Sequence, residues 1–237
     1  MLIKEFFGTL LAAHLGLRTF DFNIMVLGDA DEIPLGRDGR SRALPGPAFV
    51  TRAEKGTTWS GSENELKSVE NRDMVTRLVI FDMLTLNTDR YLNHAGTINE
   101  NKENVFLSEE SSSRGMFSLV AMDFTHCLLG GQSISSTLNH DQNVKSDKLY
   151  GLFPAFNSFL KSEAVDDILA RIKSLKKQTV GELLEAIPYQ WGLRDDKKKL
   201  LGNFVIDRGR FLVENVKNMI WHLITEQQNL FLRERGE

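Results

Sequence analysis

The sequence Asn87-Thr88-Asp89-Arg90 follows an apolar helical pattern, and Met122-Asp123-Phe124-Thr125-His126 follows two short strand-like runs. An acid at the end of an apolar helix and a second acid at the end of a strand pair can meet in one cleft. Phosphoryl transfer uses such a set, because one acid orients the attacking hydroxyl and accepts its proton. Another acid and an asparagine hold Mg²⁺ on the nucleotide phosphates. The two motifs therefore predict a phosphoryl-transfer site.

Helical patterns lie on both sides of this stretch. Apolar residues at helical spacing predict a helix over residues 2–15, ending near Gly16. The pattern Ser62-x-x-Glu65 is typical of a helix start, and we expect one helix from there to Leu86. From about residue 160 onward the pattern is helical, with a predicted cap at Thr179-x-x-Glu182 and a long helix from Asp195. The last third of the chain is therefore expected to be a helical lobe.

Strand-like runs occur only before these last helices. The runs predicted as strands are residues 20–27 and 48–51, and a hairpin is predicted from 105–107 and 117–122. The segments predicted as loops are residues 34–47, which are rich in Pro and Gly, and the polar stretches 99–104 and 108–114. The sequence predicts an α+β fold with a boundary near residue 55, where strand-like sequence gives way to helix.

Composition excludes several classes of protein. The 237 residues carry a net charge of −3, which lacks the basic footprint of a nucleic-acid-binding protein. A single Cys127 excludes an intrachain disulfide and a multi-cysteine metal site, which suits a reducing compartment. No apolar run approaches the ~18 residues that a transmembrane helix needs. We expect a cytoplasmic protein that binds neither nucleic acid nor membrane.

The motifs resemble those of the HipA-like kinases, distant relatives of protein kinases and of the phosphatidylinositol 3-/4-kinases. The resemblance rests on Asn87-Thr88-Asp89-Arg90, on Met122-Asp123-Phe124-Thr125-His126, on Ile187-Pro188-Tyr189-Gln190-Trp191 and on a first helix that carries Glu5. It implies a protein-kinase-like fold with a truncated N-terminal lobe over residues 1–55. A mainly helical C-terminal lobe over residues 56–237 would hold the catalytic loop, a metal-binding hairpin and a helical bundle. ATP and Mg²⁺ are the implied cofactors.

The resemblance also implies roles for individual residues. Asp89 would be the catalytic acid, Asp123 the metal-binding acid, and Glu5 the glutamate that pairs with a nucleotide-binding lysine. The family usually places its metal-binding asparagine five residues after the catalytic acid, where this chain has His94. Asn93 lies one residue early. Asn104 precedes an apolar strand as the family's asparagine does, which would make residues 92–103 an insertion. We favour Asn104 over Asn93.

One departure from the family concerns the segment before Glu5, which contains no glycine-rich loop and no suitable lysine. The chain is then a fragment, starts at a misassigned methionine, is completed by another polypeptide, or is an inactive relative. We expect phosphoryl transfer to a hydroxyl, first of all to a protein serine or threonine. The alternatives are transfer to a lipid or small molecule, and an inactive kinase-like module that binds a partner protein.

Overall fold

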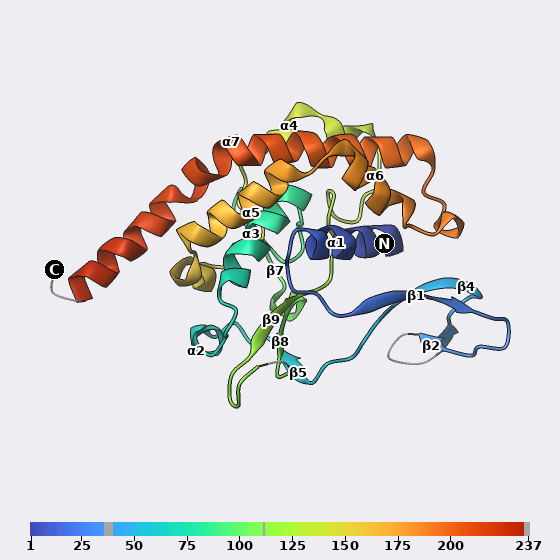
Figure 1. Ribbon diagram of the computed structural model, residues 1–237, viewed down its shortest axis with the longest axis horizontal. Helices are drawn as coiled ribbons and strands as arrows, with labels where there is room; N and C mark the ends of the chain where they lie inside the picture. The colour runs from blue at the N-terminus through green and yellow to red at the C-terminus, as the bar shows by residue number, and fades with distance from the viewer. Residues whose placement is uncertain (36–39, 111, 235–237) are drawn as a thin grey trace.

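The computed structural model describes residues 1–35, 40–110 and 112–234, and it has an α+β fold (Figure 1). The helices are α1 (Leu2–His14), α2 (Glu63–Lys67), α3 (Asp73–Thr85), α4 (Asp141–Val144), α5 (Ser162–Ser174), α6 (Lys177–Glu185) and α7 (Asp195–Glu234). The strands are β1 (Phe22–Leu27), β2 (Pro34–Leu35), β3 (Ser41–Arg42), β4 (Gly46–Thr51), β5 (Gly56–Thr58), β6 (Tyr91–His94), β7 (Thr97–Glu100), β8 (Val105–Ser108) and β9 (Ser118–Ala121). The predicted helix over residues 2–15, the strands near 20–27 and 48–51, and the hairpin of β8 and β9 are confirmed.

The sheets are small and antiparallel. β1 pairs with β4, β2 with β3 and β6 with β7, and β8 lies between β5 and β9 in a three-stranded sheet. The β1–β4 ribbon extends away from the helices, as Figure 1 shows. The strands therefore form several separate small sheets and not one continuous sheet.

Helix α3 is the centre of the larger, helical part of the fold. Its residues from Met74 to Thr85 are buried except for Arg77, because the helix packs against α5, α7 and β9. A helix that is apolar on nearly every side is stable only when it is covered on nearly every side. The C-terminal end of α3 is consequently held inside the protein, and Asp89 follows it directly.

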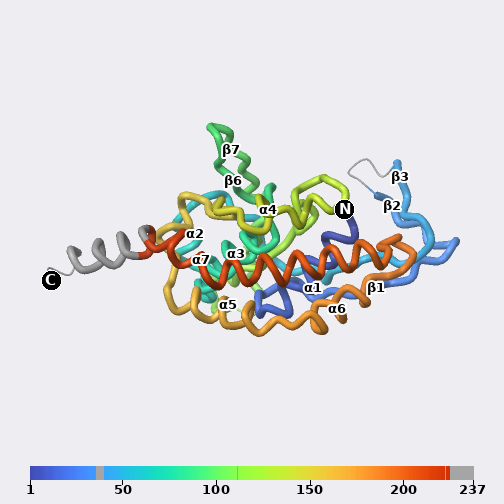
Figure 2. Tube along the Cα trace, turned by 90° about the horizontal axis from the view of Figure 1, so that it is seen from above, coloured from blue at the N-terminus to red at the C-terminus, as the bar shows by residue number. Residues whose placement is uncertain are grey.

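Helix α7 packs across α5 and α6 (Figure 2). Its fully buried Arg208 donates hydrogen bonds to the backbone carbonyl of Met83 at 3.0 Å and to that of Ser146 at 2.6 Å. Burial lowers the pKa of Arg208 to about 10, so the group stays charged at neutral pH. Arg208 thus fastens the last turn of α3 to the segment that follows α4.

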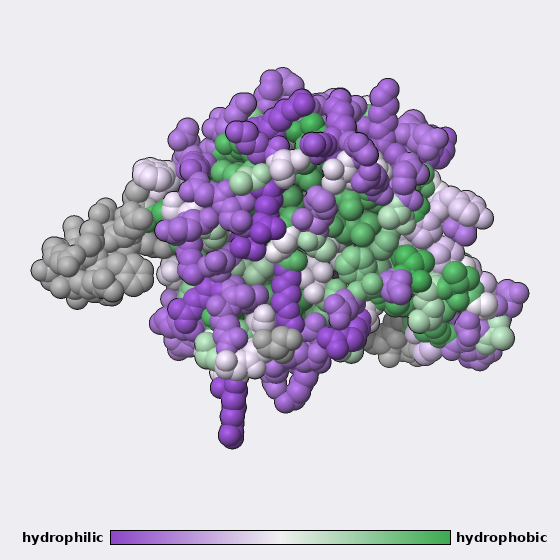
Figure 3. Space-filling view, in the orientation of Figure 1, coloured by the Kyte–Doolittle hydropathy of each residue, from purple (hydrophilic) through white to green (hydrophobic). Residues whose placement is uncertain are grey.

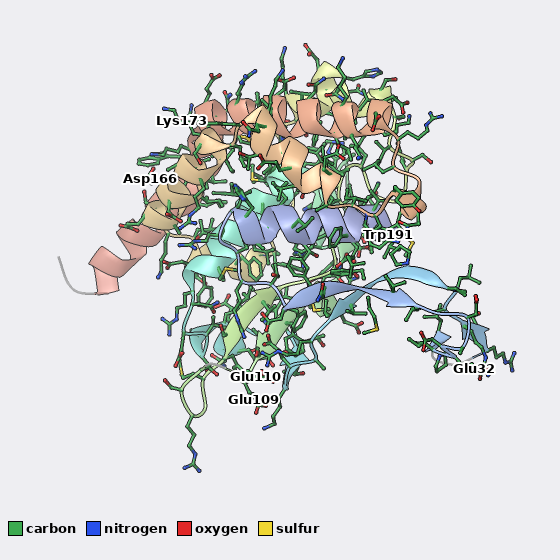
Figure 4. The ribbon with its side chains drawn as sticks, turned by 45° about the vertical axis from the view of Figure 1, so that its right-hand side comes forward. Glu32, Glu109, Glu110, Asp166, Lys173 and Trp191 are labelled. Atoms are coloured by element: carbon green, nitrogen blue, oxygen red, sulfur yellow. The ribbon has the colours of Figure 1, made fainter. Side chains whose placement is uncertain are left out.

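An aromatic cluster joins the first helix to the β1–β4 ribbon. The ring of Phe6 meets those of Phe22, Phe49 and Trp191 at centroid distances of 5.5–6.2 Å. The Trp191 indole donates to the Pro47 carbonyl at 2.9 Å. Trp191 lies between α1 and the ribbon in Figure 4 and packs the two together.

Three predictions about the helices are wrong: the length of one helix, the partner of Glu65 and the start of another helix. The helix expected from Ser62 to Leu86 is two helices, because Asn71 leaves helical geometry to form a pair of hydrogen bonds with the backbone of Leu119. Ser62 caps α2 as predicted, but Glu65 bonds Ser60 instead of Ser62. The cap predicted at Thr179 is also wrong, since α6 already begins at Lys177.

Two predicted loops contain strands. The range 34–47 holds β2, β3 and the start of β4, while residues 36–39 within it lie outside the described residues. The range 99–104 holds the end of β7 and a 3₁₀ turn. Residue 111 of the predicted 108–114 loop also lies outside the described residues.

The outer part of the ribbon exposes large apolar side chains. Val26 is 76% exposed and Leu44 is 84% exposed, and hydrophobic residues gather on this side of the molecule in Figure 3.

Across the part of the chain that the structure describes, no helix has the length and apolar character to cross a membrane.

The contact between α1 and the segment after β9 requires a glycine at position 8. A Cβ atom on Gly8 would lie 2.4 Å from the Phe124 Cβ. We expect Gly8→Ala to lower the free energy of unfolding by about 1–3 kcal/mol, because the helix must move away from Phe124. Urea denaturation followed by circular dichroism measures this change.

Gly181→Ala in α6 is the matched control. A Cβ atom there would meet nothing within 4 Å, so this variant should be stabilised by up to about 1 kcal/mol. Equal losses in the two variants would contradict the close packing of α1 on Phe124.

Candidate active site

Asp89 lies in a tight turn that follows α3. The helix ends at Leu86, which has a left-handed φ of 50°, and the side chain of Asn87 then bonds back to Asp82 at 3.1 Å. The Asn87 Oδ1 accepts a hydrogen bond from the Asp89 backbone N–H at 3.2 Å. Asparagine is suited to such turns because its side chain can bond the backbone two residues on. Asn87 therefore sets the position from which the Asp89 side chain projects.

Arg90 is fully buried and links three segments. Its Nε donates to Asp82 at 2.7 Å, one Nη donates to the Asn104 carbonyl, and the other donates to the Met122 carbonyl at 2.9 Å. Burial raises the pKa of the Asp82 carboxyl, and the Arg90 guanidinium opposes that rise. One guanidinium thus brings Asn104 and the residue before Asp123 next to the Asp89 turn.

The Asp89 carboxylate is held by two amides. Its Oδ2 accepts hydrogen bonds from the Nδ2 of Asn104 at 2.8 Å and from the Nδ2 of Asn101 at 3.0 Å. The His126 Nδ1 lies 3.7 Å from the same oxygen. Asp89 is therefore oriented by two amides from the segment between β7 and β8, and His126 of the Asp123 segment lies nearby.

Asp123 has strained backbone geometry. Its φ is 54°, in the left-handed region that costs a residue with a side chain roughly 1–2 kcal/mol. Its Oδ1 accepts hydrogen bonds from the Thr125 N–H at 3.2 Å and the Thr125 hydroxyl at 2.6 Å. Leu128 and Leu129 shortly after it also have positive φ. Strained residues cluster at functional sites, where the surrounding structure maintains them.

Glu5 contacts this segment directly from α1. Its Oε2 accepts a hydrogen bond from the Phe124 N–H at 2.5 Å. Burial raises the pKa of Glu5 to about 7; the Phe124 N–H lowers that pKa and the nearby Asp123 raises it. The structure therefore places Glu5 next to the Asp123 segment, and both residues line one pocket.

A pocket of about 310 Å³ opens beside these acids. It is lined by Glu5, Phe20, Phe49, Thr51, Met122, Asp123 and Thr125. The β1–β4 ribbon supplies one wall, and the Asp123 segment supplies the other. The pocket combines aromatic surface with carboxylate and hydroxyl oxygens.

Oxygen atoms suited to a hard cation remain free here. Neither Asp123 Oδ2 nor Asn104 Oδ1 takes part in a hydrogen bond within the described residues. Those residues contain no group of three or more His, Cys, Asp or Glu that could hold a metal. Mg²⁺ is commonly bound by one or two protein oxygens together with phosphates and water. The free oxygens of Asp123 and Asn104 fit such a partial site.

Asn93, the other candidate ligand, lies elsewhere. It is on β6, in a hairpin that follows Arg90, and in the described residues no hydrogen bond joins its side chain to Asp89 or Asp123. Its side chain lines a different pocket, together with Leu149 and Asn157.

Sequence reasoning missed three residues at this site. Asn101 binds Asp89, and Arg90 organises the turn from within the core. Lys4 is buried, and its Nζ donates to the carbonyls of Leu128, at 3.1 Å, and Gly130. Burial lowers the pKa of this ammonium. For Lys4 and Arg90, the only signal in the sequence was their position next to Glu5 and next to Asp89.

The fold and the cleft have the features of a kinase-like phosphotransferase. A family model described as HipA-like kinase matches residues 1–224. The chain belongs to the HipA-like kinase family. A search of the curated proteins found no match.

The buried Arg90–Asp82 pair generates a stability prediction. Arg90→Met leaves the Asp82 carboxyl buried without its partner, and we expect a loss of about 3–5 kcal/mol in the free energy of unfolding. Urea titration measures the loss. The exposed pair of Arg194 and Asp196 is the control, and Arg194→Met should change stability by less than about 0.5 kcal/mol. A similar small change in both variants would contradict the organising role of Arg90.

Glu5 generates a pH prediction for the protein free of metal. Its pKa is about 7 in the folded protein and lower in the unfolded chain, so folding takes up a proton between those values. The stability that Glu5 contributes is fully present below its unfolded pKa and is lost as the pH rises toward 7. Relative to Glu5→Gln, wild type should therefore lose about 1–3 kcal/mol between pH 5 and pH 8. Urea titrations across that range, in buffer with a chelator, measure the difference, and a constant difference would contradict it.

Proposed function

We propose that this chain transfers the γ-phosphoryl group of Mg²⁺-ATP to a hydroxyl group, and that the acceptor is a serine or threonine of a protein. The observation that carries the proposal is the assembly around Arg90. A single guanidinium holds the Asn104 and Met122 carbonyls, so that Asp89, Asn104 and Asp123 converge from three separate segments. The same set of two acids and an amide serves phosphoryl transfer.

Asp89 is the proposed catalytic base. The amides of Asn101 and Asn104 orient its carboxylate, which accepts the proton of the acceptor hydroxyl. The hydroxyl oxygen forms a bond to the γ-phosphorus, the bond from that phosphorus to the bridging β-γ oxygen breaks, and ADP leaves. Mg²⁺, when bound, would neutralise charge that develops on the phosphates.

Asp123 and Asn104 are the proposed ligands for Mg²⁺, and the 310 Å³ pocket is the proposed nucleotide site. The free oxygens of both side chains support this assignment. Glu5 would stabilise the Asp123 segment through its bond to Phe124 and borders the same pocket. The single cysteine, buried and with its thiol pKa raised by burial, suits a protein of the reducing cytoplasm.

A second candidate function is supported by the exposed ribbon. Val26 and Leu44 are exposed apolar residues that do not line the pocket beside Asp123. Exposed apolar surface often marks a protein interface. An inactive kinase-like module would bind its partner there without needing nucleotide.

Thermal denaturation with Mg²⁺ alone, ATP alone and both together tests the nucleotide site. Ligand at a hundredfold its dissociation constant adds about 2.7 kcal/mol, which raises the midpoint by several degrees at roughly 2–4 °C per kcal/mol. We expect a shift that needs both ligands and is lost in Asp123→Ala. Asp147→Ala is the control and should keep the full shift. No shift in wild type would overturn the nucleotide site and favour the binding module.

Asp89→Asn tests the base. The amide cannot accept the proton, so phosphoryl transfer measured with γ-³²P-ATP and a peptide mixture should fall by at least about 10²-fold. The thermal shift with Mg²⁺ and ATP should remain, because Asp89 is not among the proposed metal ligands. Full transfer by Asp89→Asn would remove this residue from the mechanism.

A further inference from the structure

A second pocket begins on the strand that leaves the Asp89 turn. Its volume is about 450 Å³, and β6, the segment 149–157 and α7 enclose it. The residues that line it are Tyr91, Asn93, Leu149, Leu152, Pro154, Asn157 and Leu223. The β6–β7 hairpin rises from the body of the molecule (Figure 2), and its strand β6 supplies Tyr91 and Asn93 to the pocket.

The pocket lies close to Asp89 because two of its lining residues follow Asp89 closely in the chain. Tyr91 and Asn93 are the second and fourth residues after Asp89, and a strand rises about 3.3 Å per residue. Because Asp89 and Arg90 lie in a turn, these rises are upper limits: the Tyr91 Cα lies within roughly 7 Å of the Asp89 Cα, and the Asn93 Cα within roughly 13 Å.

Packing holds the base of the pocket in place. The Tyr91 carbonyl accepts a hydrogen bond from the Gly151 N–H at 2.8 Å, and the Tyr91 ring lies 5.2 Å from that of Phe153. Through Tyr91, the segment that forms the far wall is thus joined to the strand that starts at the catalytic turn.

The chemistry of the wall is uncharged. Leucine and proline side chains alternate with two amides and a tyrosine, and no lining residue carries a charge. The Oδ1 of Asn157 is buried, and none of the described residues donates a hydrogen bond to it. A buried acceptor without a donor costs free energy, and rotation of the Asn157 side chain toward the pocket would let a ligand donor recover it.

We propose that this pocket, called here the acceptor pocket, binds the protein segment that receives the phosphoryl group. It takes one bulky apolar side chain located two to four residues from the acceptor serine or threonine, as set by the strand rise of about 3.3 Å per residue. A backbone N–H of the same segment donates to Asn157. This inference rests on the proposed kinase function and adds the sequence class of its substrate.

Several observations favour a peptide over a lipid. The pocket offers an amide acceptor and Asn93 at its rim, which match a peptide backbone better than an acyl chain. It also begins at the catalytic turn itself, so an extended segment can reach Asp89 and the pocket together. A charged substrate residue would enter without a partner among the lining side chains, at a high desolvation cost.

The test is a selection from displayed peptides that carry a central serine between randomised positions. The full chain is loaded with Mg²⁺ and a non-hydrolysable ATP analogue, and bound peptides are sequenced. We expect Leu, Ile, Met, Val or Phe to be enriched at one fixed position, two to four residues from the serine. Enrichment without such a fixed distance overturns the proposal.

Three variants locate the binding. Leu149→Arg places a charge in the acceptor pocket and should weaken a selected peptide at least about tenfold. Asn157→Leu removes the acceptor and should weaken it about threefold to tenfold. Leu175→Arg changes a half-buried leucine of another pocket and should leave the affinity unchanged. Unchanged affinity in Asn157→Leu and in a folded Leu149→Arg overturns the proposal.

The thermal-shift experiment separates this inference from the proposed function. A normal shift with Mg²⁺ and ATP but no pocket-dependent peptide enrichment overturns the acceptor pocket alone. Phosphoryl transfer that occurs only to a lipid or a small alcohol has the same result. No thermal shift overturns the kinase function on which the inference rests.

Discussion

The ion pair of Arg90 and Asp82 is the interaction on which the candidate site depends. Both side chains are fully buried, and the remaining Arg90 donors reach the backbone of Asn104 and of Met122. Two charges can occupy a core only when each is paired and hydrogen-bonded. Satisfying Arg90 therefore forces the turn after α3, the start of β8 and the end of β9 into one place.

Helix α1 adds a second constraint from the opposite side. Gly8 allows the helix to approach Phe124, Glu5 accepts the Phe124 N–H, and Lys4 binds the carbonyls of Leu128 and Gly130. These contacts surround Asp123 and stabilise its left-handed backbone. Three neighbouring residues of one helix thus support the strained segment, in addition to the bond from Arg90 to the Met122 carbonyl.

The hairpin of β6 and β7 connects the Asp89 turn to the acceptor pocket. It separates Asp89 from Asn104 in sequence, yet Asn101 and Asn104 return to the Asp89 carboxylate. The chain leaves the Asp89 turn along β6 and returns after β7, where Asn101 and Asn104 bond the Asp89 carboxylate. Its first strand carries Tyr91 and Asn93 to the wall of the acceptor pocket, so one hairpin joins the Asp89 turn to this pocket.

The sequence by itself determined the α+β class, most of the elements and the family, because these depend on local periodicity and on the order of short motifs. It also singled out Asp89, Asp123, Glu5 and Asn104. The structure joins Asn104 to Asp89 by a hydrogen bond and places Glu5 and Asp123 in the lining of one pocket. It did not reveal the β6–β7 hairpin, since its turn uses Ala95 and Gly96 instead of Asn-Gly, with Ala95 at φ 51°.

Only the tertiary structure decided between Asn104 and Asn93 as a neighbour of Asp89. The sequence favoured Asn104 because an apolar strand follows it, but the local pattern does not show which asparagine contacts Asp89. The choice follows from Arg90, whose buried charge needs the Asn104 carbonyl, while β6 pairing directs Asn93 to another pocket. The break between α2 and α3 has the same origin, because Asn71 bonds a strand 48 residues away. Contacts between distant segments depend on which groups must be satisfied inside the core, and no local pattern records that requirement.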